Sequence, residues 1–314
     1  MKSLWDKQEL ILVTGKGGVG KSTCAAGIAL GLAQQGKRTL LVDLAARPSI
    51  RDMFSVPTTA REPVAAVAAT PNFYALHIKM EDAIRDYFAE SLPVGRLVDI
   101  ATNNSVLDRL WKAAPSFNEL VVWSAILHYV RGTHPRAKMK FDHVVVDMPA
   151  SGHAVTMLGV PQGITKIARL GNIAERAREL VTLFSDPKRT AMVVVTLRDE
   201  LPVNETIQLR ARLAEEVDVN VTHIVLNQVF QRPWAESEDH EWLHLQKHVS
   251  GHATLGPWLQ QRCKWSDRQA VHEARLRDQA SDAAFVSIAE HMERGEALAN
   301  KIAESLSQVE EVAQ

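Results

Sequence analysis

The sequence predicts an α/β fold built on a doubly wound, mostly parallel sheet. Short apolar runs typical of buried strands alternate along the chain with segments of helical periodicity. The first apolar run, residues 10–14, leads into a glycine-rich loop and then a helix. The 314 residues, 46% apolar and 23% charged, suit a globular protein and could hold one large domain or two smaller ones. We predict a single domain over residues 1–314.

Six strands are predicted in chain order. They cover residues 10–14, 38–43, 73–78, 143–147, 191–196 and 222–227. Between the third and fourth strands, residues 80–140 are predicted to form an inserted helical subdomain, because apolar residues recur there at helical spacings. Core packing or a dimer surface is the favoured role of this insertion. After the last strand, apolar residues from Phe285 to Val309 step by three and four, which predicts a C-terminal amphipathic helix over residues 281–314.

The loop after the first strand reads GKGGVGKST and fits the phosphate-binding template Gly-x4-Gly-Lys-Ser/Thr. Its glycines would let backbone N–H groups crowd around phosphates at the N-terminus of the next helix. Lys21 would reach the β- and γ-phosphates, and the Ser22 hydroxyl would ligate Mg²⁺. The residues expected to line a nucleoside triphosphate are Gly15, Lys16, Gly17, Gly18, Val19, Gly20, Lys21, Ser22 and Thr23.

Two features of the chain resemble one family of ATPases. The early lysine of the loop, Lys16, is similar to that of the deviant Walker A P-loop ATPases. The strand 143–147 ends in Asp147 and continues as Asp147-Met-Pro-Ala-Ser-Gly-His153, followed by a leucine and a proline. This segment resembles switch II of ArsA and of the ATPases that target tail-anchored proteins, in particular the bacterial half-size ArsA-like paralogues.

The resemblance implies a P-loop ATPase that sandwiches ATP in a dimer, with Lys16 contacting the partner's nucleotide. Lys16, Lys21 and Asp147 would be the catalytic residues, and Asp147 would hold Mg²⁺ through water. Gly152 would lie near the γ-phosphate as a sensor, and Asn227 would read the adenine ring. The partner would be a second copy of the chain or an ArsA-like paralogue, together with an unidentified protein client.

The switch I segment, residues 40–49, departs from the family pattern. Asp43 matches the first aspartate of the pattern D-x-D, but Ala45 stands at the second, which orients the attacking water in the family. The register is supported by Asp52-x-Phe54, which resembles the downstream family motif without a gap. We therefore expect ATP to bind and hydrolysis to slow by about two to four decades, about 3–5 kcal/mol.

Three functions remain open on the sequence. The favoured one is a hydrolysis-poor ATP-binding subunit paired with an active paralogue. The alternative is a self-sufficient ATPase homodimer that drives protein targeting or transport. The third, a metal-dependent hydrolase, is suggested by the H-E-x-x-H pattern from His240 through Glu241 to His244. His248 and His252 continue this histidine ladder, and a solvated helix face is favoured over a Zn²⁺ or Ni²⁺ site.

Composition limits the classes of partner and the cellular compartment that we expect for this protein. The formal net charge of −1 gives no support for nucleic-acid binding. The two cysteines, Cys24 and Cys263, lie far apart, and without a C-x-x-C pair neither a zinc clasp between subunits nor an arsenite site is expected. Free thiols and the absence of an apolar leader lead us to expect a cytoplasmic protein. No apolar run is long enough to span a bilayer, so we expect no integral membrane segment.

Overall fold

A computed structural model describes the fold of this chain. The described residues are 4–5, 7–44, 49–55, 57, 62–79, 82–84, 86–87, 115–134, 139–168, 170–230 and 255–307. Their strands are β1 (Leu10–Gly15), β2 (Thr39–Asp43), β3 (Val64–Ala65), β4 (Phe73–His77), β5 (His143–Asp147), β6 (Thr190–Thr196), β7 (His223–Val229) and β8 (Ala284–Ala289). Their helices are α1 (Lys21–Gln34), α2 (Ser49–Phe54), α6 (Pro115–Arg131), α7 (Ser151–Ile167), α8 (Asn172–Ser185), α9 (Glu200–Val217), α11 (Leu255–Gln279) and α12 (Gly295–Ser307).

The strands form one sheet in the order β3-β4-β2-β5-β1-β6-β7-β8. All its pairings are parallel except that of β3 with β4. The chain leaves β1 toward one side of the sheet and later returns to add β6 on its other side. The carboxyl end of β1 is therefore the point where the winding reverses, which is where open α/β sheets bind ligands. The predicted doubly wound, mostly parallel α/β sheet is confirmed.

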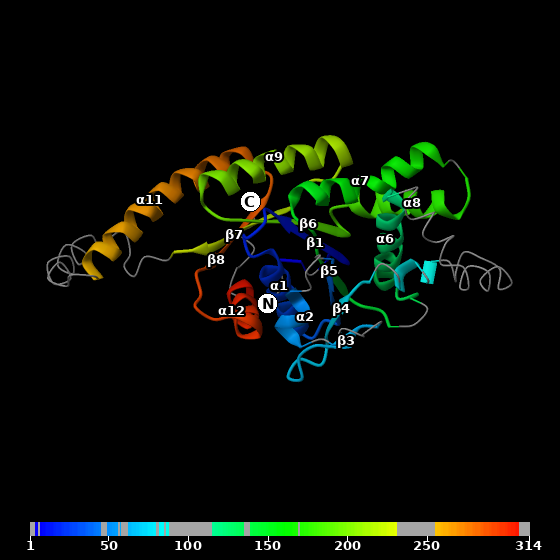
Figure 1. The fold of residues 1–314 in the computed structure, drawn as a ribbon, viewed down its shortest axis with the longest axis horizontal. Helices are drawn as coiled ribbons and strands as arrows, with labels where there is room; N and C mark the ends of the chain where they lie inside the picture. Colours follow the sequence, from blue (N-terminus) through cyan, green and yellow to red (C-terminus); the bar gives the residue numbers. More distant parts are fainter. Residues whose placement is uncertain are drawn as a thin grey trace.

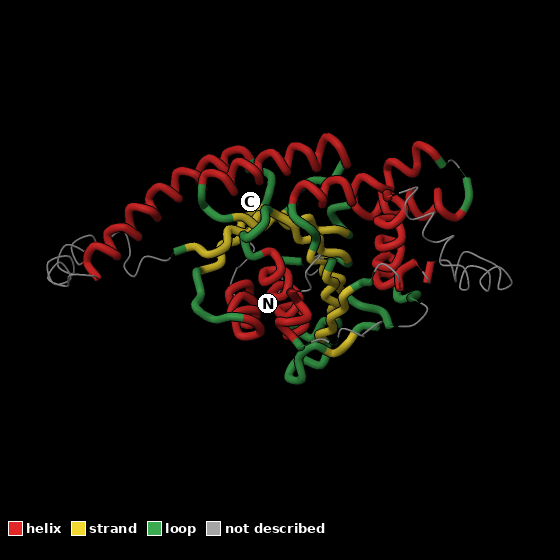
Figure 2. The backbone as a smooth tube through the Cα atoms, viewed as in Figure 1, coloured by secondary structure: helices red, strands yellow, loops and turns green. Residues whose placement is uncertain are grey.

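Two layers of helices cover the sheet, one on each face (Figure 1). Successive side chains of a strand point to opposite faces, so Leu10 and Leu12 of β1 join one hydrophobic core while Ile11 and Val13 join the other. The first core is closed by α6, α7, α8 and α9. The second is closed by α1, α2 and α12, which lie together below the sheet in Figure 2. Both faces of the central strands are thus buried, which explains their nearly continuous apolar sequences.

Helix α1 packs closely against α12, because small residues of α1 line the contact between the two helices. Its residues from Cys24 to Ala33 are all buried. A Cβ placed on Gly27 would lie 2.3 Å from Cγ2 of Ile302, a distance that no side chain tolerates. The last described helix therefore rests directly on the backbone of the helix that follows the glycine-rich loop.

The C-terminal prediction was wrong for part of its range. Residues 284–289 form the edge strand β8, paired in parallel with β7, and the helix begins only at Gly295. Val286 and Ile288 are buried in alternation, which is the period of a strand. The apolar residues that we assigned to one helical pattern therefore belong to two different elements, strand β8 and helix α12.

The inserted helical subdomain is described in part. Within the predicted range of 80–140, the structure shows α6 and short helical pieces at residues 82–84 and 86–87. Trp123 of α6 is buried and donates its indole N–H to the carbonyl of Met157 in α7, at 2.9 Å. This helix therefore belongs to the main core on its sheet-facing side. The role of the whole insertion stays a prediction.

Candidate functional site

The predicted site residues come from three strands that end at the same edge of the sheet. The glycine-rich loop follows β1, Asp147 closes β5, and Asn227 lies near the end of β7. The carboxyl ends of parallel strands meet at one edge, which explains how residues so far apart in sequence gather there. The loop, Asp147 and Asn227 are thereby brought together as the sequence predicts.

The loop is shaped by glycines in the left-handed region and is braced by Asn227. Gly18 and Gly20 have φ angles of 87° and 90°. At Gly20 a Cβ would lie 2.3 Å from Nδ2 of Asn227, so this position requires glycine for space as well as for conformation. The buried Asn227 donates an Nδ2 hydrogen to the carbonyl oxygen of Val19 at 2.8 Å. Its amide therefore holds the loop, a role that the sequence did not suggest.

The N-terminus of α1 opens toward the loop without a capping side chain. Gly20 is the N-cap, no side chain of the described residues caps the helix, and its first turn contains no acidic residue. The apex of the loop, Gly17 and Gly18, is exposed to solvent. Free N–H groups and the positive end of the helix dipole therefore face an open space, which suits a phosphate group.

The side chain of Lys21, which is expected to bind phosphate together with the loop, is hydrogen-bonded to the loop itself. Its Nζ donates a hydrogen bond to the carbonyl oxygen of Lys16 at 3.1 Å. Burial lowers the pKa of this lysine, and the nearby charge of Asp147 opposes that shift. Ser22 and Thr23 follow in the first turn of α1 and are half-buried. An anion bound at the loop would give the Lys21 ammonium a better partner than a neutral carbonyl.

Asp147 is a buried carboxylate that forms no hydrogen bond of normal geometry with the described residues, although the Ser22 hydroxyl lies close enough to influence it. It is 0% exposed, and neither oxygen has a hydrogen-bond partner among the residues that the structure describes. Burial raises its pKa to about 7; the charge of Asp43 acts in the same direction, while the Ser22 hydroxyl and Lys21 favour the ionised form. A buried carboxylate left unpaired in this way is costly unless a cation compensates it. Together with the neighbouring hydroxyl of Ser22, the oxygen donors fit Mg²⁺.

Asp43 lies beside Asp147, in register on the neighbouring strand β2, and is also 0% exposed. Its surroundings differ from those of Asp147. One oxygen of its carboxylate accepts the backbone N–H of Ile50 at 3.4 Å and lies 4.0 Å from Nδ1 of His77. Asp43 thus ties the end of β2 to the start of α2. Ala45, on which the predicted loss of hydrolysis depends, lies outside the described residues.

Lys16 has a partner that sequence reasoning did not single out. Its Nζ forms an ion pair with Oε1 of Glu205 in α9, at 2.8 Å. No sequence signal could have revealed this pair, because it depends on how α9 packs beside the loop. Lys16 therefore lies, as predicted, at the edge that holds the loop, but its ammonium is bound within its own chain.

Of the remaining residues singled out in the sequence, Gly152 lies close to the same edge, and the two cysteines are free. Gly152 is exposed in the first turn of α7, the helix that follows Asp147. Cys24 is buried in α1, and burial raises the pKa of its thiol to about 12, with Asp147 adding to that shift. Cys24 and Cys263 are both free, and the buried Cys24 thiol is therefore unreactive.

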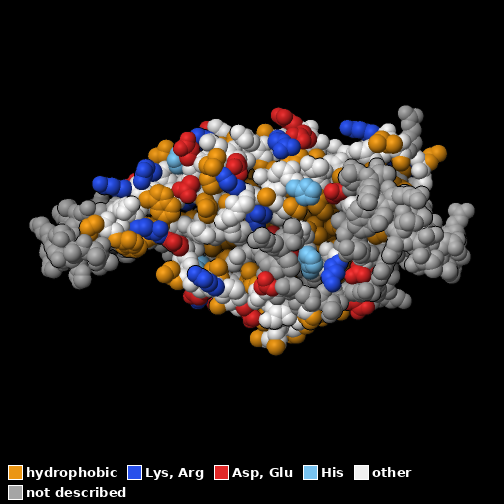
Figure 3. Space-filling model, in the orientation of Figure 1, with side chains coloured by type: hydrophobic (Ala, Val, Ile, Leu, Met, Phe, Trp, Pro, Cys, Tyr) orange, Lys and Arg blue, Asp and Glu red, His pale blue; other side chains and the backbone are white. Residues whose placement is uncertain are grey.

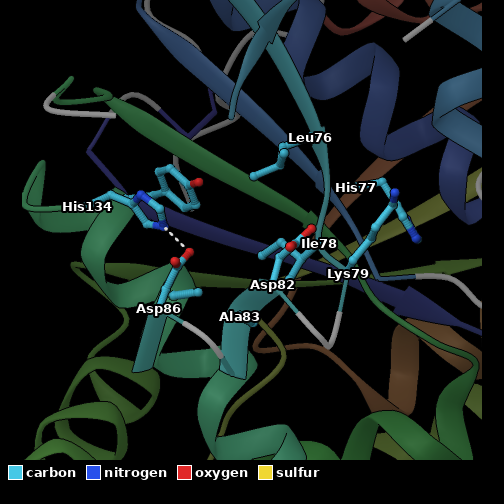
Figure 4. Close-up of a pocket in the computed structure, with 10 residues that line it drawn as sticks. Leu76, His77, Ile78, Lys79, Asp82, Ala83, Asp86 and His134 are labelled. Carbon is cyan, nitrogen blue, oxygen red and sulfur yellow. Dashed lines mark ion pairs between the residues drawn. The ribbon is translucent and has the colours of Figure 1, made fainter. Parts of the chain in front are cut away.

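A separate hollow lies at the end of β4 and does not fit a nucleotide. Figure 4 shows His134 and Asp86 pointing toward each other across it, 3.9 Å apart, while His77 and Lys79 point away. The stacked ring of Tyr129, with its centroid 4.2 Å from that of His134, closes one side. The space that water can occupy is about 20 Å³, room for about one water molecule. This hollow is a packing feature of the helical insertion.

The other sequence candidates find no support in the described part of the chain. The histidines of the ladder, His240, His244, His248 and His252, and Glu241 lie outside it. The described residues contain no group of three or more side chains suited to a metal ion. No helix among them has the length and apolar character needed to cross a membrane. On the face shown in Figure 3, acidic and basic side chains are interspersed, which is not the single-sign surface typical of nucleic-acid binding.

Comparison with known proteins gives an independent result. The model of the family described as anion-transporting ATPase matches residues 8–181 and 164–252. ATPase BagA of Mycobacterium tuberculosis is 29% identical over 220 residues, which are 69% of this chain and 64% of that protein. The arsenical pump-driving ATPase of Acidiphilium multivorum is 29% identical over 253 residues, 76% of this chain and 42% of that protein. ATPase GET3C of Arabidopsis thaliana is 24% identical over 277 residues, which cover 74% of this chain and 69% of that protein. The chain thus spans less than two thirds of the length of these two bacterial relatives.

Proposed function

This chain belongs to the anion-transporting ATPase family, and we propose that it is an ATP-binding subunit whose own hydrolysis is slow. The observation that carries this proposal is the uncapped start of α1 beneath a loop of left-handed glycines, facing the unpaired carboxylate of Asp147. The loop offers N–H donors, and Asp147, close to Ser22 and Lys21, offers an acceptor that forms no hydrogen bond of normal geometry with the described part of the chain. That division suits a nucleotide phosphate accompanied by a cation.

The residues of the loop would divide the binding between them. Backbone N–H groups of the loop and of the first turn of α1 donate to phosphate oxygens. Lys21 leaves the carbonyl of Lys16 and binds the β- and γ-phosphates through its ammonium. The Ser22 hydroxyl and, through water, Asp147 would hold Mg²⁺, which when bound neutralises charge on the phosphates. Asn227 keeps the loop in shape and, by the family resemblance, would also contact adenine.

Slow hydrolysis is proposed from the switch I sequence and from the setting of Asp43. Ala45 offers no group that could orient a water molecule. Asp43, the neighbouring carboxylate, is enclosed and accepts a backbone N–H at the start of α2, which supports a structural role for it. Because positioning of the nucleophile accounts for much of phosphoryl-transfer catalysis, we expect a loss of about 3–5 kcal/mol in transition-state stabilisation.

We further propose that the subunit pairs with another across the nucleotide, with Lys16 reaching the partner's phosphates. The partner is an active paralogue that supplies hydrolysis, and the location is the cytoplasm. A second copy of the chain is the alternative partner, in a homodimer that drives protein targeting or transport. One relative is an arsenical pump-driving ATPase, but this chain has only two cysteines, far apart in sequence, for binding a metalloid. A protein client is the better candidate.

Two measurements on the purified chain test this function. Equilibrium titration with a fluorescent ATP analogue should show binding that strengthens with Mg²⁺ and disappears in Lys21→Ala. Single-turnover hydrolysis of ATP should be slow for the chain alone and faster after addition of a paralogue that has aspartate at the position of Ala45. Rapid steady-state phosphate release by the chain alone would contradict slow hydrolysis, and failure to bind Mg-ATP would contradict the whole proposal.

A further inference from the structure

Lys16 and Glu205 form an ion pair at the surface of the site. Their charged atoms lie 2.8 Å apart, and the two side chains are 27% and 34% exposed. The pair lies beside the open apex of the loop, where Gly17 and Gly18 face solvent. A second subunit can therefore approach this region, but the ammonium of Lys16 must leave Glu205 before it can bind any group of that subunit.

Of the two partners, Glu205 is the one with a fixed position. It lies in α9 between Val203 and Thr206, which are both buried against the core. The helix is also tied to α11, for example by the hydrogen bond from Gln269 to Asp199 at 3.1 Å. Lys16 lies on a loop and has a long side chain with many rotamers. Separation of the pair therefore moves chiefly the Lys16 side chain, because α9 holds the backbone of Glu205 in place.

We propose that Glu205 is a positioning residue that holds Lys16 on its own subunit until ATP and a second copy of the chain draw it across the interface. This inference rests on the homodimer, the alternative assembly named under the proposed function, and adds the group that opposes its formation. Closure of the dimer exchanges one anionic partner of Lys16 for another, the phosphates of the facing subunit. Glu205 thereby sets how much ATP is needed before two subunits associate.

The expected size of the effect follows from the exposure of the pair. Ion pairs between partly exposed side chains contribute little, so removal of this one should shift the association equilibrium by about two- to fivefold. Such a shift does not switch the protein on or off. It changes the ATP concentration at which association is half complete.

The test uses Glu205→Gln, which removes the charge and keeps the shape of the side chain. Glu216→Gln is the matched control, because Glu216 lies on the same helix and is ion-paired with Arg212 at 2.6 Å, in a pair separate from that of Lys16. The first measurement is the rate at which Lys16 is acetylated by acetic anhydride in the nucleotide-free protein, followed by peptide mass spectrometry. We expect a two- to fivefold faster reaction in Glu205→Gln and no change in Glu216→Gln.

The second measurement is the ATP concentration at which half of the protein associates, determined by analytical ultracentrifugation. We expect it to fall two- to fivefold in Glu205→Gln, to shift less in Glu205→Asp, which keeps the charge, and to stay constant in the control. Urea unfolding curves of all variants should superimpose on that of the wild type.

Each other outcome overturns the inference at a defined step. Equal acetylation of Lys16 in wild type and Glu205→Gln would show that the pair does not hold the lysine. Faster acetylation with unchanged or weaker association would show that Glu205 does not oppose the dimer. A wild-type chain that binds ATP but never associates would instead refute the homodimer, and the inference with it, while leaving a heterodimer with a paralogue open. Should Glu205→Gln fail to fold, Glu205→Ala, which also removes the charge, carries both measurements, and an unchanged result there counts against the proposal.

Discussion

Strands β2 and β5 lie side by side and each ends in a fully buried aspartate, yet the two carboxylates have different surroundings. Asp43 and Asp147 are paired in register, so they occupy equivalent places at the edge of the sheet. Asp43 accepts a backbone N–H, whereas neither oxygen of Asp147 forms a hydrogen bond of normal geometry with the described residues. Buried polar groups are normally satisfied, and an exception is expected where a ligand completes the site. The comparison shows that the partners of an acidic side chain, more than its place on the sheet, indicate whether it holds the fold or a ligand.

The largest expected effect comes from adding a carboxylate two residues beyond Asp43. Ala45→Asp should raise the single-turnover rate of ATP hydrolysis by about two to four decades, because it restores the group that orients the attacking water in the family. ATP affinity should stay unchanged. Normal ATP binding without a gain in rate would mean that Asp43 already does this work or that another part of the site is deficient.

Removal of the Asp147 carboxylate should abolish the contribution of Mg²⁺ to nucleotide affinity. In Asp147→Asn the affinity for Mg-ATP should fall by about ten- to a hundredfold, the range expected for one charge-assisted interaction, while affinity measured in excess chelator changes little. In the metal-free protein the free energy of unfolding should rise, because a buried charge without a partner is gone. The titration with fluorescent nucleotide, with and without Mg²⁺, decides the point. Retention of the full Mg²⁺ effect would exclude Asp147 as a ligand.

His223 is the first residue of β7 and therefore lies at the amino ends of the strands, opposite to the carboxyl ends that hold Asp43 and Asp147. Burial lowers the pKa of its ring to about 4. Below the ordinary histidine pKa of about 6.5, His223 is protonated in the unfolded chain but stays neutral in the folded chain. The free energy of unfolding therefore falls as the pH decreases from about 6.5 toward 4. Relative to His223→Gln, the wild type should lose about 2 kcal/mol of unfolding free energy between pH 7 and pH 5. Urea unfolding of both proteins at the two pH values measures this difference, in which other titrating groups cancel, and parallel behaviour would contradict the burial of the ring.

The smallest effect is expected at the satisfied aspartate. Asp43→Asn keeps an oxygen that can accept the N–H of Ile50, so the free energy of unfolding should fall by only about 0.5–1 kcal/mol. The Mg²⁺ dependence of ATP binding should persist, which makes this variant the control for Asp147→Asn. A collapse of Mg-ATP affinity in Asp43→Asn would erase the distinction between the two carboxylates.

The sequence predicted the parts of the structure that depend on local pattern. The buried strands, the loop and the gathering of Asp147 and Asn227 at one edge all follow from apolar runs and from the geometry of parallel sheets. Strand β8 was missed because its short alternation lies next to helical spacings in α12. Its short length left too few residues for the period of two to stand out.

Contacts between distant elements could not be predicted. The bond from Asn227 to Val19 and the ion pair of Lys16 with Glu205 depend on how β7 and α9 are placed beside the loop, and no spacing in the sequence records that. The capping role of Asp43 likewise depends on where α2 begins. The reading of Ala45 stays a prediction, because it concerns chemistry rather than fold and lies outside the described residues.

The contact of Gly27 with Ile302 has a consequence for biosynthesis. Helix α1 is translated before α12, whose surface covers it and which follows more than 250 residues later. While the ribosome is still adding residues, one side of α1 stays in water, and a nascent chain with exposed apolar surface is prone to aggregate. The helix that follows the glycine-rich loop therefore gains its full support only after α12 has emerged.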